Sequence, residues 1–231
     1  MAEQEKGLRR IHIPSESSQR DQRDLPSVPE IESIFQELVI HAYLTQMEIF
    51  DPPLWHHSRS TTHYALLMAR ALEFTPDDER ILKQSSLLHD LGMMGIDREI
   101  TKKKGELTPE ESKRIQTHPL DGVKILSVFP FFDHVKPFIK HHHEWYDGTG
   151  YPERLVGEEI PLMSRIIMIA DAFVAMTSER PYRAALTIDE ALAIIDENRG
   201  RQFDPGLITL FNTVVSEELR STPPQVNKRD A

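Results

Sequence analysis

The chain of 231 residues contains no cysteine, which excludes disulfide bonds, thiolate metal ligands and a cysteine nucleophile. It also lacks a run of about 18 apolar residues, so no helix is expected to span a membrane. The N-terminus, MAEQEKGLRR, lacks the apolar core of a signal peptide, and the cytoplasm is the expected location. Runs that alternate apolar and polar residues are scarce, which disfavours a β-sheet protein.

The charge of the chain limits its partners. A formal net charge of −10 argues against binding to polymeric nucleic acid, which requires a basic surface. The same charge would repel an anionic substrate, but two bound divalent ions add about four positive charges at one point and reverse the local sign. Hydrophobic content of 39% and charged content of 28% are typical of a globular protein.

We divide the chain into four segments. Residues 1–28 are polar and patternless, and we predict a disordered tail there. Residues 29–50 have apolar residues at helical spacing and are predicted to form an N-terminal helix. Residues 51–218 are predicted to form a single domain, and residues 219–231 a second flexible tail.

Helix-start signals recur within the predicted domain. Thr75, Thr108 and Thr187 each precede acidic residues, the arrangement of an N-cap with a first turn that complements the helix dipole. Pro76 and Pro109 follow the first two at the position where helices tolerate proline. We therefore predict an all-α fold, a single helical bundle.

Seven imidazole and carboxylate side chains are the main candidates for chemistry. They are His57, His89, Asp90, His118, His142, His143 and Asp171. Histidine and carboxylate are ligands that Fe, Mn and Zn accept, and seven ligands are too many for one ion. The set suggests two metals that share a bridging carboxylate, an arrangement that suits the attack of water on a phosphate ester.

Two of the histidines are adjacent. Val135, Phe138, Ile139, His142 and His143 follow helical spacing, so both histidines are expected on a buried helix face. A buried imidazole needs a partner, because an unmet polar group costs about 1–3 kcal/mol. For one histidine, a hydrogen bond to the backbone is the simpler interpretation, whereas two on an apolar face favour a metal.

The two aspartates have different contexts. Asp171 lies in the apolar segment RIIMIADAFVAM, and an aspartate among so much apolar surface is rarely buried without a cation. The alternative is an ion pair with Arg165 or Arg180. His89 and Asp90 end the predicted helix that starts at residue 75, where both side chains can reach a single ion.

A glycine-rich turn, DGTGYP at residues 147–152, follows the histidine pair. Glycines permit close backbone approach and proline stiffens the exit, so we expect this turn to border the metal site. A plain surface loop is the alternative. Further along, Arg180 and Arg183 offer guanidinium groups that bind phosphate with bidentate geometry, although surface arginines are common.

Together these segments resemble the HD-GYP family, a branch of the HD phosphohydrolase superfamily. The resemblance covers about residues 50 to 215, in the order and spacing of that family. Its blocks are His57-Ser58-Arg59, Leu88-His89-Asp90, His118-Pro119 with Gly122, His142-His143-Glu144, residues 147–152, Arg165 to Asp171, Thr177 to Arg183, and Phe203-Asp204-Pro205.

The resemblance implies an HD-type helical bundle that binds two divalent ions, iron or manganese, through the seven residues above. It implies hydrolysis of cyclic di-GMP to pGpG or GMP by a metal-activated hydroxide, with Asp90 as the bridging ligand that positions it. By the same resemblance, Gly150, Tyr151, Arg180 and Arg183 would contact the substrate. Diguanylate cyclases of the GGDEF type are candidate protein partners.

Three positions depart from the family pattern. Met93 replaces a lysine expected to neutralise the scissile phosphate, and the loss of one such donor typically costs about 10²–10³ in rate. Val174 replaces an aspartate that would contact substrate or donate a proton, and Pro53 replaces a glutamate of three-metal members, which favours two metals. A non-catalytic cyclic di-GMP receptor or docking module, and a hydrolase of another cyclic dinucleotide, are therefore the alternative functions.

Overall fold

The computed structural model describes residues 27–179 and 184–221, and within these ranges the chain is helical and contains no strand. The all-α prediction is confirmed, while the division into domain and tails stays a prediction, because the predicted tails lie mostly outside these ranges. The elements are α1 (Val28–Phe50), α2 (Pro52–Ala71), α3 (Pro76–Leu88), η2 (Leu91–Gly95), α4 (Arg98–Thr101), α5 (Pro109–Ile115), α6 (His118–Leu126), η3 (Pro130–Phe132), α7 (Lys136–Lys140), η4 (Gly157–Glu159), α8 (Leu162–Thr177), α9 (Ile188–Glu197) and α10 (Pro205–Ser221). Among the described helices, none is long and apolar enough to cross a membrane.

The predicted N-caps begin the helices as expected. The Thr75 hydroxyl accepts the N–H of Asp78 at 3.2 Å at the start of α3. Thr108 forms a full capping box on α5, since its hydroxyl accepts the N–H of Glu111 while that carboxylate accepts the N–H of Thr108. Thr187 does the same on α9. Each cap satisfies backbone N–H groups that a helix start leaves without partners.

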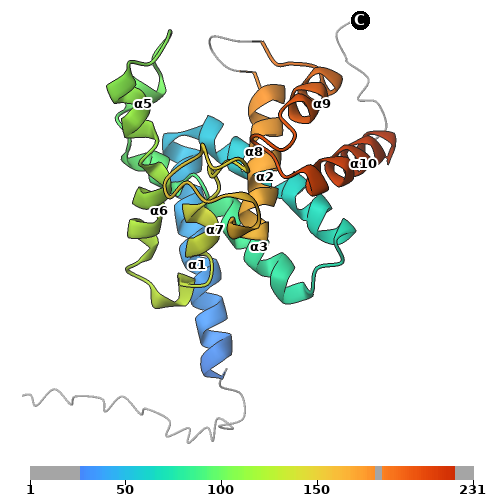
Figure 1. Cartoon of the computed structure of the whole chain (residues 1–231). Helices are drawn as coiled ribbons and strands as arrows, with labels where there is room; N and C mark the ends of the chain where they lie inside the picture. The colour runs from blue at the N-terminus through green and yellow to red at the C-terminus, as the bar shows by residue number, and fades with distance from the viewer. Residues whose placement is uncertain (1–26, 180–183, 222–231) are drawn as a thin grey trace, which may run out of the picture.

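Two apolar cores meet at α3. The first surrounds the buried middle of α8 and includes residues of α2, α9 and α10; the second joins α1, α6 and α7. Leu82 belongs to the first core and Leu88 to the second, so α3 bridges them. Figure 1 shows α9 and α10 on one side of the molecule and α5 and α6 on the other. The end of α3, where His89 and Asp90 follow Leu88, therefore lies between the two halves.

One sequence prediction about local structure is wrong. Helical spacing over residues 135–143 predicts a continuous helix, but α7 ends at Lys140 and both His142 and His143 lie in the turn that follows. In a longer helix the Ile139 carbonyl would accept the N–H of His143. Here it accepts Nδ1–H of the His142 ring at 2.7 Å instead. The side chain thus occupies the acceptor that the next helical turn requires.

Gly92 allows a close backbone contact between η2 and α6. It lies inside η2, and a Cβ added to it would be 2.0 Å from the His118 carbonyl oxygen and 2.6 Å from the Gly122 nitrogen. Both are backbone atoms of α6, which cannot move aside as a flexible side chain could. The absence of a side chain at residue 92 therefore allows η2 to contact the start of α6 and brings His118 towards Asp90.

We predict that Gly92→Ala lowers the free energy of unfolding by about 1–3 kcal/mol, since the new methyl group overpacks a backbone contact. Urea unfolding monitored by circular dichroism measures this change. Gly95→Ala is the matched control, because its Cβ would meet only the end of the Arg114 side chain, at 4.0 Å. Equal stability of the two variants would contradict the packing argument.

Candidate metal centre

The structure brings all seven candidate residues into one region. They come from α2 (His57), the residues after α3 (His89 and Asp90), the first residue of α6 (His118), the turn after α7 (His142 and His143) and α8 (Asp171). Their nitrogen and oxygen atoms form two groups that could each hold an ion. One group is Asp90, His118, His142 and His143, and the other is His57, His89 and Asp90. Asp171 joins the second group through His57, at 2.8 Å.

Asp90 is common to both groups, and its two oxygens face different histidines. Oδ1 lies 3.1 Å from Nε2 of His118 and 4.0 Å from Nε2 of His142. Oδ2 lies 3.3 Å from Nε2 of His89 and 3.7 Å from Nε2 of His57. The carboxylate side chain is 14% exposed, so it is reachable from solvent only over a small area. Each oxygen of Asp90 therefore faces a different group of imidazoles.

Hydrogen bonds to the backbone orient three of the rings. In each case Nδ1–H donates to the carbonyl oxygen of the residue three positions earlier. The pairs are His89 with Ser86 at 2.8 Å, His118 with Ile115 at 2.8 Å, and His142 with Ile139 at 2.7 Å. Donation from Nδ1 leaves the Nε2 lone pair of a neutral ring free to ligate, and metal-binding histidines commonly use this arrangement.

The donor atoms fit metal ions better than they fit one another. Nε2 of His118 and Nε2 of His142 are 3.2 Å apart, although both rings already donate from Nδ1. Nε2 of His89 is buried and has no hydrogen-bond partner among the described residues. Facing lone pairs and an unpartnered buried nitrogen are unfavourable unless a cation lies between them. Imidazole with carboxylate suits Fe, Mn or Zn.

Burial and neighbouring charges set the ionisation of the centre. Burial, with the nearby His118, lowers the pKa of His143 to about 3, and burial with neighbouring imidazoles lowers the pKa of His142 far below its usual value. Burial also opposes the charge on His89, but the Asp90 carboxylate raises its pKa to about 9. Burial would raise the pKa of Asp90, yet His89 and His118 hold it well below its usual value. Neutral imidazoles and an ionised carboxylate are the forms that ligate metals, so His142, His143 and Asp90 are in that form, whereas His89 must release a proton before it can ligate.

Asp171 pairs with His57 of the cluster and not with Arg165. Burial would raise the pKa of its carboxyl, and the hydrogen bond to His57 lowers it below the usual value. Arg165, the alternative partner from the sequence, instead donates to the Asp204 carboxylate and to the Ile160 carbonyl. Its ion pair thus joins α8 to the start of α10.

The glycine-rich turn packs directly on the histidine pair. The Tyr151 ring stacks on the His143 ring, with centroids 4.9 Å apart and planes 27° apart, and the Tyr151 N–H donates to the His143 carbonyl at 3.1 Å. A Cβ on Gly150 would be 2.1 Å from the Trp145 nitrogen, so only glycine allows this approach. Burial raises the pKa of the Tyr151 hydroxyl, which therefore stays neutral. The other two predicted substrate contacts, Arg180 and Arg183, lie outside the described residues.

Glu144 is a residue of this region whose role sequence reasoning missed. It is buried, and its carboxylate accepts the N–H groups of Glu153, Arg154 and Leu155 at 2.6, 3.1 and 3.1 Å. These bonds hold the segment after the glycine-rich turn against Glu144, the residue that follows the histidine pair. The only sequence signal is an acid immediately after two histidines, and that pattern is equally compatible with a metal ligand.

The three residues that depart from the family pattern differ in how exposed they are. Met93 is in η2 and partly exposed, three residues after Asp90. Val174 is 2% exposed and packs in the core around α8, so this position offers almost no surface to a substrate. Pro53 lies in the first turn of α2, where proline is tolerated. Burial thus excludes Val174 from direct contact with a bound substrate, whereas Met93 is partly exposed and close to Asp90 in the chain.

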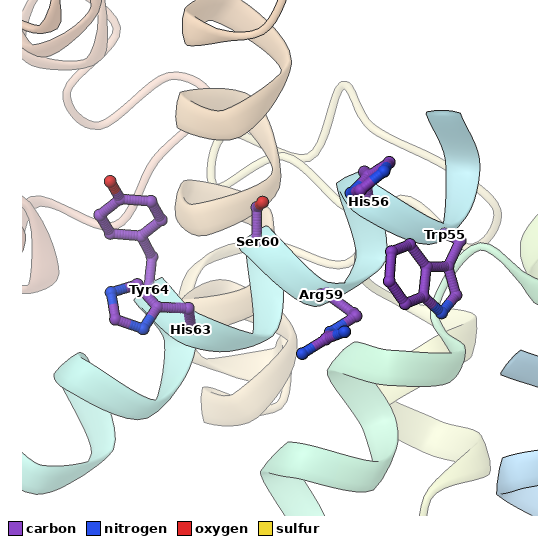
Figure 2. Close-up of a pocket in the computed structure, with 6 residues that line it drawn as sticks. All are labelled: Trp55, His56, Arg59, Ser60, His63 and Tyr64. Carbon is purple, nitrogen blue, oxygen red and sulfur yellow. The ribbon is translucent and has the colours of Figure 1, made fainter. Parts of the chain in front are cut away.

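A pocket of about 420 Å³ lies along the flank of α2, the helix that carries His57. Figure 2 shows its lining: Trp55, His56, Arg59, Ser60, His63 and Tyr64. The Arg59 guanidinium lies over the Trp55 ring, 4.7 Å from its centroid, and makes no hydrogen bond to the described residues. His63 contacts Glu218 at 3.1 Å. The pocket is within the size range of small-molecule sites, about 300–1,000 Å³.

Known proteins are similar to this chain in sequence and in fold. The chain is 38% identical over 175 residues to 3′3′-cGAMP-specific phosphodiesterase 3 of Vibrio cholerae, a match that covers 76% of this chain and 38% of that protein. It is 38% identical over 187 residues to the cyclic di-GMP phosphodiesterase response regulator RpfG of Xanthomonas campestris, covering 80% and 49%. The crystal structure of the cyclic GMP-AMP phosphodiesterase V-cGAP3 of V. cholerae superimposes with a TM-score of 0.54 at 30% identity, covering 87% and 45%.

Residues 45–207 match the HD domain family, and the chain belongs to that family. The resemblance to its HD-GYP branch is confirmed by the same comparisons. The chain spans less than half the length of the two curated relatives described above, 38% and 49%.

We predict that His57→Ala reduces the bound metal from about two ions per chain to about one, because the second group loses a ligand. Elemental analysis of protein purified without oxygen measures the metal content, and this readout does not depend on activity. His56→Ala is the control, since His56 is adjacent but faces the exposed α2 pocket. Equal metal content in the two variants would remove His57 from the site.

Proposed function

We propose that this chain is a metal-dependent phosphodiesterase that hydrolyses cyclic di-GMP to pGpG, GMP or both. The observation that carries the proposal is the single carboxylate, Asp90, which faces two separate groups of imidazoles, each containing at least one buried ring. The names of the relatives support a cyclic dinucleotide as the substrate class.

In this proposal two ions, iron or manganese, are held by the two groups. His118, His142 and His143 would hold one, His57 and His89 with Asp171 would hold the other, and Asp90 would contact both. Bound divalent ions supply positive charge that polarises a phosphoryl oxygen and makes water a stronger acid.

The protein itself supplies alignment and shielding. The Nδ1–H bonds to backbone carbonyls hold the rings at fixed angles, so little reorganisation is needed when a charged phosphate enters. The Tyr151 ring covers one face of His143 and excludes water there, and Glu144 keeps the turn in place. Arg180 and Arg183 are proposed to bind the phosphoryl oxygens.

We expect protein loaded with iron or manganese to convert cyclic di-GMP to a linear product. Chromatography of the products measures this, and the His89→Ala/Asp90→Ala variant is the background control. A parallel incubation with 3′3′-cGAMP distinguishes the proposed substrate from another cyclic dinucleotide. If no linear product exceeds the control with cyclic di-GMP, the proposed reaction is wrong.

A non-catalytic receptor or docking protein, with GGDEF-type cyclases among the candidate partners, is the second candidate function. The observation that favours it is the apolar Met93 near Asp90, where a cationic side chain would stabilise charge on the phosphate. Such a protein would bind cyclic di-GMP in calorimetry without turnover.

We predict that Met93→Lys raises kcat by up to roughly 10²-fold, because one well-placed hydrogen-bond donor contributes about that factor to the rate. Met94→Lys is the matched control, because it adds the same charge at the adjacent, exposed position. Equal rates in the two variants would show that the missing lysine does not limit the reaction.

A further inference from the structure

Helix α1 exposes an unusual amount of apolar surface. Of the fifteen large apolar side chains exposed among the described residues, seven are on this helix: Val28, Ile31, Ile34, Phe35, Leu38, Ile49 and Phe50. Phe35 is 55% and Leu38 58% exposed. Exposed apolar surface concentrated on one element commonly marks an interaction site. In Figure 1 the N-terminal half of α1 extends beyond the other helices.

Five of these seven exposed residues follow a seven-residue repeat. Counted from Val28, the positions at which two helices of a coiled coil meet are filled by Val28, Ile31, Phe35, Leu38, Ala42, Thr45 and Ile49. Only Ala42 and Thr45 are not large apolar residues. The repeat runs over about three heptads, or about 33 Å of helix, which is near the minimum for a coiled coil.

The repeat faces away from the protein's own domain. Ile40 and Met47 are the buried residues of α1 and pack in the core shared with α6 and α7. Both lie at the heptad position opposite the exposed stripe. A second helix could therefore lie along the stripe without contacting the domain that α1 covers on its other side.

We propose that α1 pairs with α1 of a second copy of this chain as a parallel two-stranded coiled coil. The positions that flank the seam are compatible with such a pair. Ile34 of one helix would lie beside Val39 of the other, and His41 beside Gln46. Neither pair places two like charges together, so nothing at the flanks opposes the association.

The distribution of apolar residues favours the parallel direction. The large ones are concentrated between residues 28 and 38, and parallel pairing lays this half of each helix against the same half of its partner. Antiparallel pairing over residues 28–45 would set Val28 opposite Thr45 and Ile31 opposite Ala42. The parallel arrangement therefore packs large apolar side chains against one another, whereas the antiparallel one packs Val28 and Ile31 against small or polar ones.

Sedimentation equilibrium of the full chain tests the association. We expect a species of about 53 kDa, twice the 26.6 kDa of one chain. Phe35→Glu/Leu38→Glu is expected to be monomeric with an unchanged circular dichroism spectrum, since both side chains are exposed in the single chain. Leu219→Glu, an exposed leucine on α10, is the control and should stay dimeric. A monomeric wild type, or a double variant that remains dimeric, overturns the proposal.

Single cysteines test the direction, because the natural chain has none. In a parallel, in-register pair, Leu38→Cys and Thr45→Cys should each form an intermolecular disulfide under mild oxidation. An antiparallel pair can bring at most one of these positions next to itself. Glu37→Cys, off the seam, is the control and should not cross-link. Cross-linking at only one seam position, or equally at residue 37, overturns the parallel arrangement.

Discussion

The centre depends on one carboxylate with little exposed surface, Asp90, that is surrounded by imidazoles. A carboxylate in such a place is unfavourable unless positive charge compensates it. The histidines around it come from separate helices and turns, so the site forms only when these elements pack against one another. Gly92 lets η2 approach α6, which places His118 3.1 Å from Asp90. The packing of the domain and the chemistry of the centre are thus coupled at a single short segment.

The remaining polar residues mainly hold loops in place. Glu144 accepts three backbone N–H groups and fastens the segment after the glycine-rich turn. Asp204 accepts from Arg165 and also from the N–H of Gly206, so it joins α8 to the first turn of α10. Two motifs that look like parts of an active site are therefore structural supports around it. Their effect on chemistry is indirect, through the positions of His143 and Asp171.

Sequence alone predicted the helices well where their signals are local. The caps at Thr75 and Thr108 act over three or four residues and need no knowledge of the fold. Helical periodicity failed after Lys140, because a side chain of the turn, His142, competes with the backbone for the Ile139 carbonyl. It also could not show that Val174 is sealed in the core, since depth depends on which helices pack against α8.

The candidate site was predictable as a set of residues but not as a geometry. Histidine and aspartate are the right donor types, and the family resemblance gives their order along the chain. Which of His56 and His57 points inward depends on how α2 is rotated against α3 and α8, and only the structure shows it. For the same reason, the exposure of α1 could not be inferred from its apolar spacing.

The three Nδ1–H bonds have a further consequence for motion. Each ring donates a hydrogen bond to a carbonyl only three residues earlier. Its orientation is therefore set by its own stretch of chain and not by contacts between helices. If α6 or α7 shifted relative to α3, the separations between donor atoms would change while every ring kept its orientation. Ions of different radius would therefore be accommodated by changes in the spacing of these elements and not by rotation of the rings.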